Sequence, residues 1–149
     1  MTKREFKRTA SVYSIGHKII VNPRCRTVAG LEIGMPLVEV FDDGEFYQIG
    51  EAVIRMLKLC FDNAPDLQVR RPPMNEPLFA AAGVKTWAAL HKKAKSIECI
   101  EDVAASKVVL IPDKKVGRWS EQHSEKTRLV PLDPTILGDA VISALADAE

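Results

Sequence analysis

The sequence contains no long hydrophobic run. Its apolar stretches are only a few residues long, and the charged N-terminal residues have no apolar segment behind them. A membrane-spanning helix needs about 20 mainly apolar residues, and a secretory signal needs an apolar segment after its charged start. We therefore expect a cytoplasmic protein with no membrane partner.

The sequence also lacks an excess of charge of either sign. Its 21 Lys and Arg residues are balanced by 20 Asp and Glu residues, which leaves a formal net charge of +1. This balance excludes the overall positive charge typical of proteins that wrap nucleic acid or bind membranes through basic surfaces. With 46% hydrophobic residues, residues 1–149 fit one ordinary domain that buries about two-thirds of its unfolded surface.

Paired cysteines and closely spaced metal ligands are absent as well. The cysteines are odd in number, and no histidine lies two to five residues from a cysteine or from another histidine. These residues are Cys25, Cys60, Cys99, His17, His91 and His123. The pattern is typical of reduced thiols in a cytosolic protein and contains no zinc motif. We expect no metal and no cofactor, with a metal site built from distant parts of the chain as the remaining alternative.

The arrangements that an enzyme would need are missing from the sequence. A thiol hydrolase requires a cysteine beside a histidine and an orienting group. Cys60 falls on the apolar face of a predicted helix and Cys99 lies in an alternating strand, which are ordinary core positions. The segment 30–34 lacks the Lys-Ser/Thr ending of a phosphate-binding loop. We therefore expect no enzymatic activity.

The first part of the chain alternates between apolar and polar residues and predicts strands. A hairpin is predicted over residues 11–15 and 18–22, ending before Pro23, followed by a weaker strand at 26–31 and a stronger one at 37–41. The spacing then becomes helical over residues 46–61, with Phe46, Ile49, Val53, Met56, Leu57 and Cys60 on the apolar face. Gly50 inside this helix predicts a close approach to the sheet.

The second part of the chain predicts a similar series. Residues 62–82 contain four prolines and predict irregular structure, and residues 84–95 predict a helix with a basic outer face. Strands are predicted at 96–100, at 107–111 before Pro112 and at 128–132, with an irregular one around Trp119. In the C-terminal helix, Asp133 is the predicted N-cap, Pro134 the first residue, and the buried face contains Leu137, Val141, Ala144, Leu145 and Ala148.

A six-residue repeat connects the two parts. Residues 49–54, IGEAVI, and residues 137–142, LGDAVI, match by identity or close chemistry, and their glycines are 138 − 50 = 88 positions apart. Each copy follows a short strand and an acidic turn. The sequence therefore predicts an α+β fold in which two antiparallel, strand-rich halves, each followed by a helix, are related by a pseudo-twofold axis and joined by a basic helix. A chance likeness between two amphipathic helices is the alternative.

Several segments carry a resemblance to a known family. They are Ile49 to Val53; the run GVKTWAALHKKAKS from Gly83 to Ser96, leading to Cys99; Leu110-Ile111-Pro112; Trp119; and Val130-Pro131-Leu132-Asp133-Pro134, leading into Leu137 to Val141. In order and spacing these segments resemble the immunity proteins of bacterial contact-dependent growth inhibition systems.

The resemblance implies a small cytoplasmic protein that binds and neutralises one cognate toxin domain. Such a domain forms the C-terminal tip of a large effector and is often a nuclease. The implied fold is similar to that of plant Whirly domains, which bind single-stranded DNA, but a shared fold does not transfer that activity. No specific nucleic-acid partner is expected, and the oligomeric state stays open.

An acidic window supports a basic partner. Residues 27–54 contain six acidic residues and no Lys, Arg or His, and residues 129–149 contain four acidic residues and no base. An acidic surface would attract the basic cleft of a nuclease. The alternative is that these acidic residues stabilise helix N-termini or are simply solvated. The candidate toxin-binding residues are Asp42, Asp43, Glu45, Arg118, Trp119, Glu121 and His123.

A single-stranded nucleic-acid-binding protein is the alternative function. The second half contains the basic residues Lys85, Lys92, Lys93, Lys95, Lys107, Lys114, Lys115 and Arg118. Such proteins interleave basic residues with exposed aromatic ones on which bases stack. Only Trp87 and Trp119 lie near these lysines, and Trp87 shares its predicted helix face with Val84 and Ala88, which predicts a core position. The sequence therefore favours the toxin-binding protein.

Overall fold

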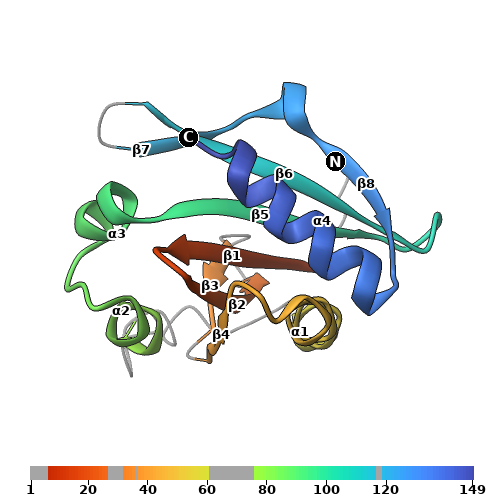
Figure 1. Cartoon of the computed structure of the whole chain (residues 1–149), viewed down its shortest axis with the longest axis horizontal. Coiled ribbons are helices and arrows are strands. Elements are labelled where there is room, and N and C mark those ends of the chain that lie inside the picture. The colour runs from red at the N-terminus through yellow and green to blue at the C-terminus, as the bar shows by residue number, and fades with distance from the viewer. Residues whose placement is uncertain (1–6, 27–31, 36, 61–75, 117–118) are drawn as a thin grey trace, which may run out of the picture.

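The computed structural model describes residues 7–26, 32–35, 37–60, 76–116 and 119–149, and its fold is α+β (Figure 1). The described residues form an eight-stranded sheet with helices packed against it. The strands are β1 Thr9–Ile15, β2 Lys18–Arg26, β3 Glu32–Gly34, β4 Glu39–Asp42, β5 Lys95–Asp102, β6 Lys107–Val116, β7 Trp119–Gln122 and β8 Arg128–Pro131. The helices are α1 Phe46–Leu59, α2 Glu76–Ala82, α3 Trp87–Lys93 and α4 Pro134–Asp147, and a 3-10 turn spans Ser124–Lys126.

The strand order confirms the two predicted halves. The central strands run β2-β1-β5-β6, with β3 and β4 on the outer side of β2 and β7 and β8 on the outer side of β6. Every pair is antiparallel. Ala10 pairs with Pro23 in the first hairpin, and the residues 88 positions later, Glu98 and Ile111, pair in the second. The repeat is therefore structural, and its pseudo-twofold axis passes between β1 and β5.

The matching helices α1 and α4 cross at their glycines. A Cβ atom on Gly50 would lie 1.9 Å from the Pro134 carbonyl oxygen, and one on Gly138 would lie 1.7 Å from that of Phe46. Phe46 and Pro134 are themselves 88 positions apart, so the contact is symmetric. Gly50 was predicted to approach the sheet, and that prediction is wrong. Both helices cover the same face of the sheet and meet at the pseudo-twofold axis.

Two hydrophobic clusters lie on opposite faces of the sheet. Alternate residues such as Val12 and Ile19 pack beneath α1 and α4, while their neighbours Tyr13 and Ile20 pack against α2 and α3. The predicted buried faces of both long helices are confirmed, except that Phe46 is 41% exposed. The helices α2 and α3 lie between the two halves in the chain and cover the face of the sheet opposite α1 and α4.

Prolines explain where the predicted elements differ from those observed. β2 continues through Pro23 and β6 through Pro112, although both strands were predicted to stop there. Each proline occupies the last pair of its hairpin ladder, where a missing N–H is least costly. Residues 76–82 form α2 instead of irregular structure, because Pro77 lies in the first helical turn, whose N–H groups need no intrahelical partner.

The predicted helix at residues 84–95 is shorter than expected. Gly83, with φ +69°, ends α2, and the Thr86 hydroxyl caps α3 by accepting a hydrogen bond from the Ala89 N–H at 3.1 Å. Two short helices therefore connect the halves. The weak strand predicted at 26–31 lies mostly outside the described residues, and β3 begins at Glu32.

Candidate functional site

The sheet register places the predicted site residues at one end of the sheet. Lys18 pairs with both Asp42 and Ile15, and Ser14 pairs with Lys95. The β4–α1 turn, the β1–β2 turn, the start of β5 and the β6–β7 hairpin therefore share this end, which we call the α3 end because α3 lies there (Figure 1). The acidic turn and β7 are separated by five strand spacings, or about 24 Å.

The acidic turn contains Asp42, Asp43 and Glu45, and two of its carboxylates are held by local bonds. Glu45 Oε1 accepts a hydrogen bond from the Asp42 N–H at 3.0 Å, and Asp43 Oδ2 lies 2.9 Å from His17 Nδ1. The hydrogen bond with Asp43 raises the pKa of His17 above its usual value. Asp42 is exposed. These local bonds stabilise the turn that precedes the first residue of α1.

In the folded protein, other carboxylates of the acidic window are paired with an arginine from outside the window. Arg55, one position beyond the window, forms ion pairs with Glu39 and with Glu51, the latter at 4.0 Å. In the second half, Arg128 pairs with Asp147, and Asp133 caps α4 by accepting a hydrogen bond from the Ile136 N–H at 3.1 Å. The two acidic windows therefore do not form one continuous acidic face.

A cleft of about 360 Å³ lies beside the acidic turn. Asp43 contributes to its lining, as do Lys93 and Lys95 from the start of the second half. Apolar residues of α4, including Ile142 and Leu145, complete the lining. The cleft thus combines one acidic and two basic groups with an apolar wall, a combination that no pattern in the sequence indicated.

The second predicted cluster lies on and after β7. Glu121 is exposed and pairs in register with Lys114, while His123 is largely covered, its side chain being 14% exposed. His123 Nδ1 is buried and has no hydrogen-bond partner among the described residues. Trp119 begins β7, its side chain lies outside what the structure describes, and Arg118 lies outside the described residues. The structure brings this cluster to the α3 end without joining it to the acidic turn.

Trp87 on α3 is exposed, although the sequence predicted a core position. Leu90 and Ala94 are buried instead, and Trp87 keeps 37% of its surface accessible. Its ring meets Phe79 edge-on at 5.2 Å and stacks on His91 at 6.1 Å, measured between ring centroids. Burial, together with the charge of Lys115, lowers the pKa of His91. In the sequence, the surface around Trp87 is indicated by residues 77–97, which contain four lysines and no Asp or Glu.

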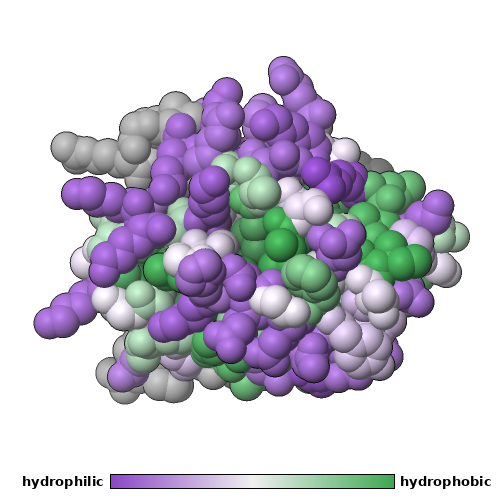
Figure 2. All heavy atoms as spheres, viewed as in Figure 1, coloured by the Kyte–Doolittle hydropathy of each residue, from purple (hydrophilic) through white to green (hydrophobic). Residues whose placement is uncertain are grey.

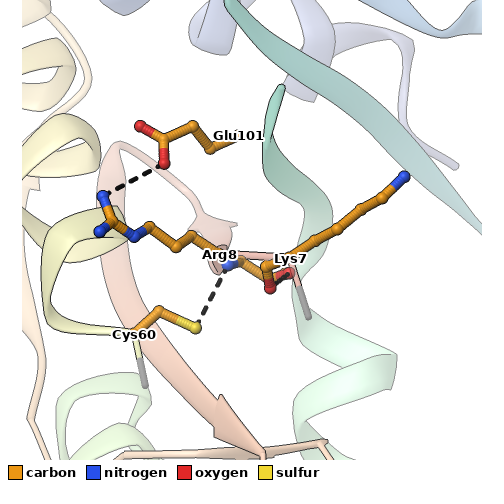
Figure 3. Close-up of polar contacts among 5 residues, drawn as sticks. Lys7, Arg8, Cys60 and Glu101 are labelled. Carbon is orange, nitrogen blue, oxygen red and sulfur yellow. Dashed lines mark hydrogen bonds and ion pairs between the residues drawn. The ribbon is translucent and has the colours of Figure 1, made fainter. Parts of the chain in front are cut away.

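The opposite end of the sheet carries a second cleft, of about 490 Å³, whose charges are balanced. Lys7 and Arg8 share its lining with Glu101 and Asp102, and Arg8 pairs with Glu101 at 3.3 Å (Figure 3). Beside it, the Thr9 N–H donates a hydrogen bond to the sulfur of Cys60 at 3.3 Å. This contact explains how a buried thiol is accommodated at the end of α1.

The described residues contain no group of three His, Cys, Asp or Glu side chains placed to hold a metal ion. Cys60 and Cys99 are buried, and burial raises the pKa of Cys99, which disfavours the reactive thiolate. None of the helices in the described part of the chain is long and apolar enough to cross a membrane. Figure 2 shows hydrophilic side chains over much of the face that bears α4, with apolar patches near its centre and at its right side.

Comparison with known proteins identifies the fold. No family model and no curated protein matches the sequence. A solved structure of a protein of unknown function from Neisseria meningitidis matches with a TM-score of 0.77 and 16% identity, covering 100% of this chain and 99% of the other. A chain of a CdiA-CT/CdiI toxin and immunity complex from Yersinia pseudotuberculosis matches with a TM-score of 0.73 and 16% identity, covering 97% and 99%. The chain has the fold of a toxin–immunity complex component.

Proposed function

We propose that this chain is an immunity protein that binds and neutralises the C-terminal toxin domain of a contact-dependent growth inhibition effector. The observation that carries the proposal is the full-length match in fold to a chain of a toxin and immunity complex. The sequence resemblance to immunity proteins favours the immunity component over the toxin. Residues 1–149 would act as one domain in the cytoplasm, where the toxin arrives.

The mechanism is occlusion of the toxin. A binding protein needs no catalytic group, and the buried settings of Cys60 and Cys99 are consistent with a role that involves no turnover. We propose a nuclease as the toxin, since the acidic turn would attract a basic substrate cleft. The proposed contact residues are Asp42, Asp43, Glu45, Arg118, Trp119, Glu121 and His123.

The proposal is tested with the C-terminal domain of the protein encoded immediately upstream. This domain, produced alone in a bacterial host, should arrest growth, and co-production of the 149-residue chain should restore it. The two proteins should also co-purify. A toxin domain from an unrelated effector is the control, which the chain should neither bind nor neutralise. Growth arrest that persists despite equal production of both proteins would contradict the proposed function.

A further inference from the structure

A basic surface lies beside the acidic turn at the α3 end. Residues 77–97 contain four lysines and no Asp or Glu, and they include α2 after its first residue, Glu76, all of α3 and the start of β5. All four lysines are exposed: Lys85, Lys92, Lys93 and Lys95. None of them has an ion-pair partner among the residues that the structure describes. Their charge is therefore available to a partner.

Lys115 on β6 extends this basic surface. Its Nζ donates a hydrogen bond to the Lys92 carbonyl oxygen at 3.2 Å, which holds its ammonium group against α3. The nearby carboxylate of Asp113 is engaged elsewhere, since it accepts a hydrogen bond from the Ser96 hydroxyl at 2.7 Å. We define the α3 patch as Trp87, His91, Lys92 and Lys115. In Figure 2, long hydrophilic side chains project at the left edge, where α3 lies.

Trp87 gives the α3 patch a rigid apolar centre. Contacts with Phe79 and His91 on two sides fix its ring, so that little side-chain entropy is lost when a partner covers it. The low pKa of His91 also keeps that ring neutral near pH 7. An exposed, pre-ordered tryptophan is the kind of side chain that forms a protein-binding hot spot, and exposed lysines on the same helix add positive charge nearby.

We propose that the α3 patch docks an acidic surface of the toxin domain. The inference rests on the proposed function and adds a second contact region of opposite charge to the acidic turn. The α3 end then presents the acidic turn together with the basic groups and Trp87 on and around α3. A partner with the opposite charge pattern can dock in only one orientation without like-charge contacts.

The observations favour a protein over single-stranded nucleic acid as the occupant. Nucleic-acid strands are bound in basic grooves where successive bases stack on several aromatic side chains. Among the side chains that the structure describes, the patch offers a single exposed tryptophan, and neither of the two clefts described above includes Trp87 in its lining. Of the four lysines, Lys93 and Lys95 line the 360 Å³ cleft, and Trp87 lies outside it, so this cleft does not combine the lysines with the exposed tryptophan on which a base would stack.

The test measures binding kinetics with the toxin domain encoded immediately upstream. The patch variant is Lys92→Glu with Lys115→Glu, and the matched control is Lys58→Glu with Lys107→Glu, which makes the same charge change at exposed positions outside the patch. At low salt the patch variant should associate about tenfold more slowly than wild type, and the difference should shrink at high salt. The control should stay within about twofold of wild type.

A second variant tests the apolar anchor. Trp87→Ala should raise the dissociation rate by about tenfold or more, because a buried tryptophan at an interface carries a large share of the affinity. Melting curves show whether this variant folds. If it does not fold, the conclusion rests on the lysine variant, whose folding is checked by the same melting curves because Lys115 also bonds the Lys92 carbonyl oxygen.

The outcomes separate this inference from the proposed function. If the wild-type chain does not bind the toxin domain, the proposed function fails and the inference fails with it. If wild type binds and the patch variant behaves like the control, the inference alone is overturned. A titration with a 20-nucleotide single-stranded DNA probe completes the test. Oligonucleotide binding that the patch variant loses while toxin binding is unchanged would assign the patch to nucleic acid and overturn the inference.

Discussion

At the scale of single residues, the contact between His17 and Asp43 makes the acidic turn sensitive to pH. The Asp43 carboxylate stabilises protonated His17 and raises its pKa above the ordinary 6.5. The stabilisation is fully present below the unfolded-state pKa and is lost as the pH rises through the higher folded-state pKa. The contact thus strengthens on mild acidification.

Replacing Asp43 with Asn should return the pKa of His17 toward its ordinary value. The hydrogen bond and charge of Asp43 are the leading causes of the shift, whereas Asp42 contributes only through a weaker charge interaction. Asp42→Asn is therefore the control and should leave most of the shift in place. An NMR titration of the imidazole protons measures both variants. Equal pKa values in wild type and in Asp43→Asn would contradict the assignment.

Asp113 should make the protein more stable as the pH falls below neutrality. Burial raises its pKa from 3.8 to about 6, a shift that the hydrogen bond from Ser96 only partly offsets. Because the folded-state pKa is the higher one, the folded state binds the extra proton, and stability rises as the pH falls from about 6 to about 4.

Asp113→Asn should remove this pH dependence. The asparagine keeps an oxygen that can accept the Ser96 hydrogen bond and carries no charge to desolvate. With allowance for partial solvent screening, it should stabilise the protein at pH 7 by about 1 kcal/mol or less. Urea denaturation at pH 7 and pH 4.5 measures the effect. A lower stability of the variant at pH 7 would show that the ionised carboxylate is favourable.

At the scale of elements, the crossing of α1 and α4 depends on two glycines. A Cβ at Gly50 or Gly138 would fall within 2 Å of a backbone carbonyl oxygen, so the helices would have to move apart. Gly50→Ala and Gly138→Ala should each destabilise the protein by about 2 kcal/mol or more, because overpacking costs more than the roughly 1 kcal/mol gained in helix propensity.

Gly44→Ala is the matched control for these two variants. Gly44 has no atom within 4 Å of an added Cβ and a backbone conformation open to other residues. The control should change stability by no more than about 0.5 kcal/mol. Chemical denaturation of the three variants measures the differences. Equal stabilities for Gly44→Ala and Gly138→Ala would mean that the helices separate without cost.

At the scale of the whole molecule, the acidic turn should speed association with a basic toxin. Replacing Asp42, Asp43 and Glu45 with Lys should slow association at low salt. The effect should weaken as salt shortens the Debye length to about 8 Å at physiological ionic strength. Kinetic binding measurements at two ionic strengths test this.

Glu45 and Asp43 also form local hydrogen bonds, so a control is needed to separate a loss of stability from a loss of charge attraction. The triple Lys variant should therefore lose about 1 kcal/mol of stability, as expected when a helix entrance loses its polar contacts. A second triple variant, which combines Asp42→Asn, Asp43→Asn and Glu45→Gln, removes the charge and keeps acceptor oxygens, so it separates folding from attraction. Unchanged association rates in both folded variants would place the interface away from the acidic turn.

Local spacing along the chain is enough to predict the two long helices. The apolar faces of α1 and α4 follow the helical period, and Asp133 with Pro134 sets the start of α4. The repeat of residues 49–54 at 137–142 predicts the two related halves. These signals lie within a few residues or recur at a fixed interval, so they can be read along the chain.

The groups that face one another are set by tertiary packing. Arg55 neutralises Glu39, and His17 approaches Asp43, across 16 and 26 positions of sequence respectively. Trp87 became exposed because α3 turns Leu90 toward the sheet. Gly50 meets α4 and not a strand. Each outcome depends on how elements distant in sequence pack, and local periodicity carries no information about the partner that an element will meet.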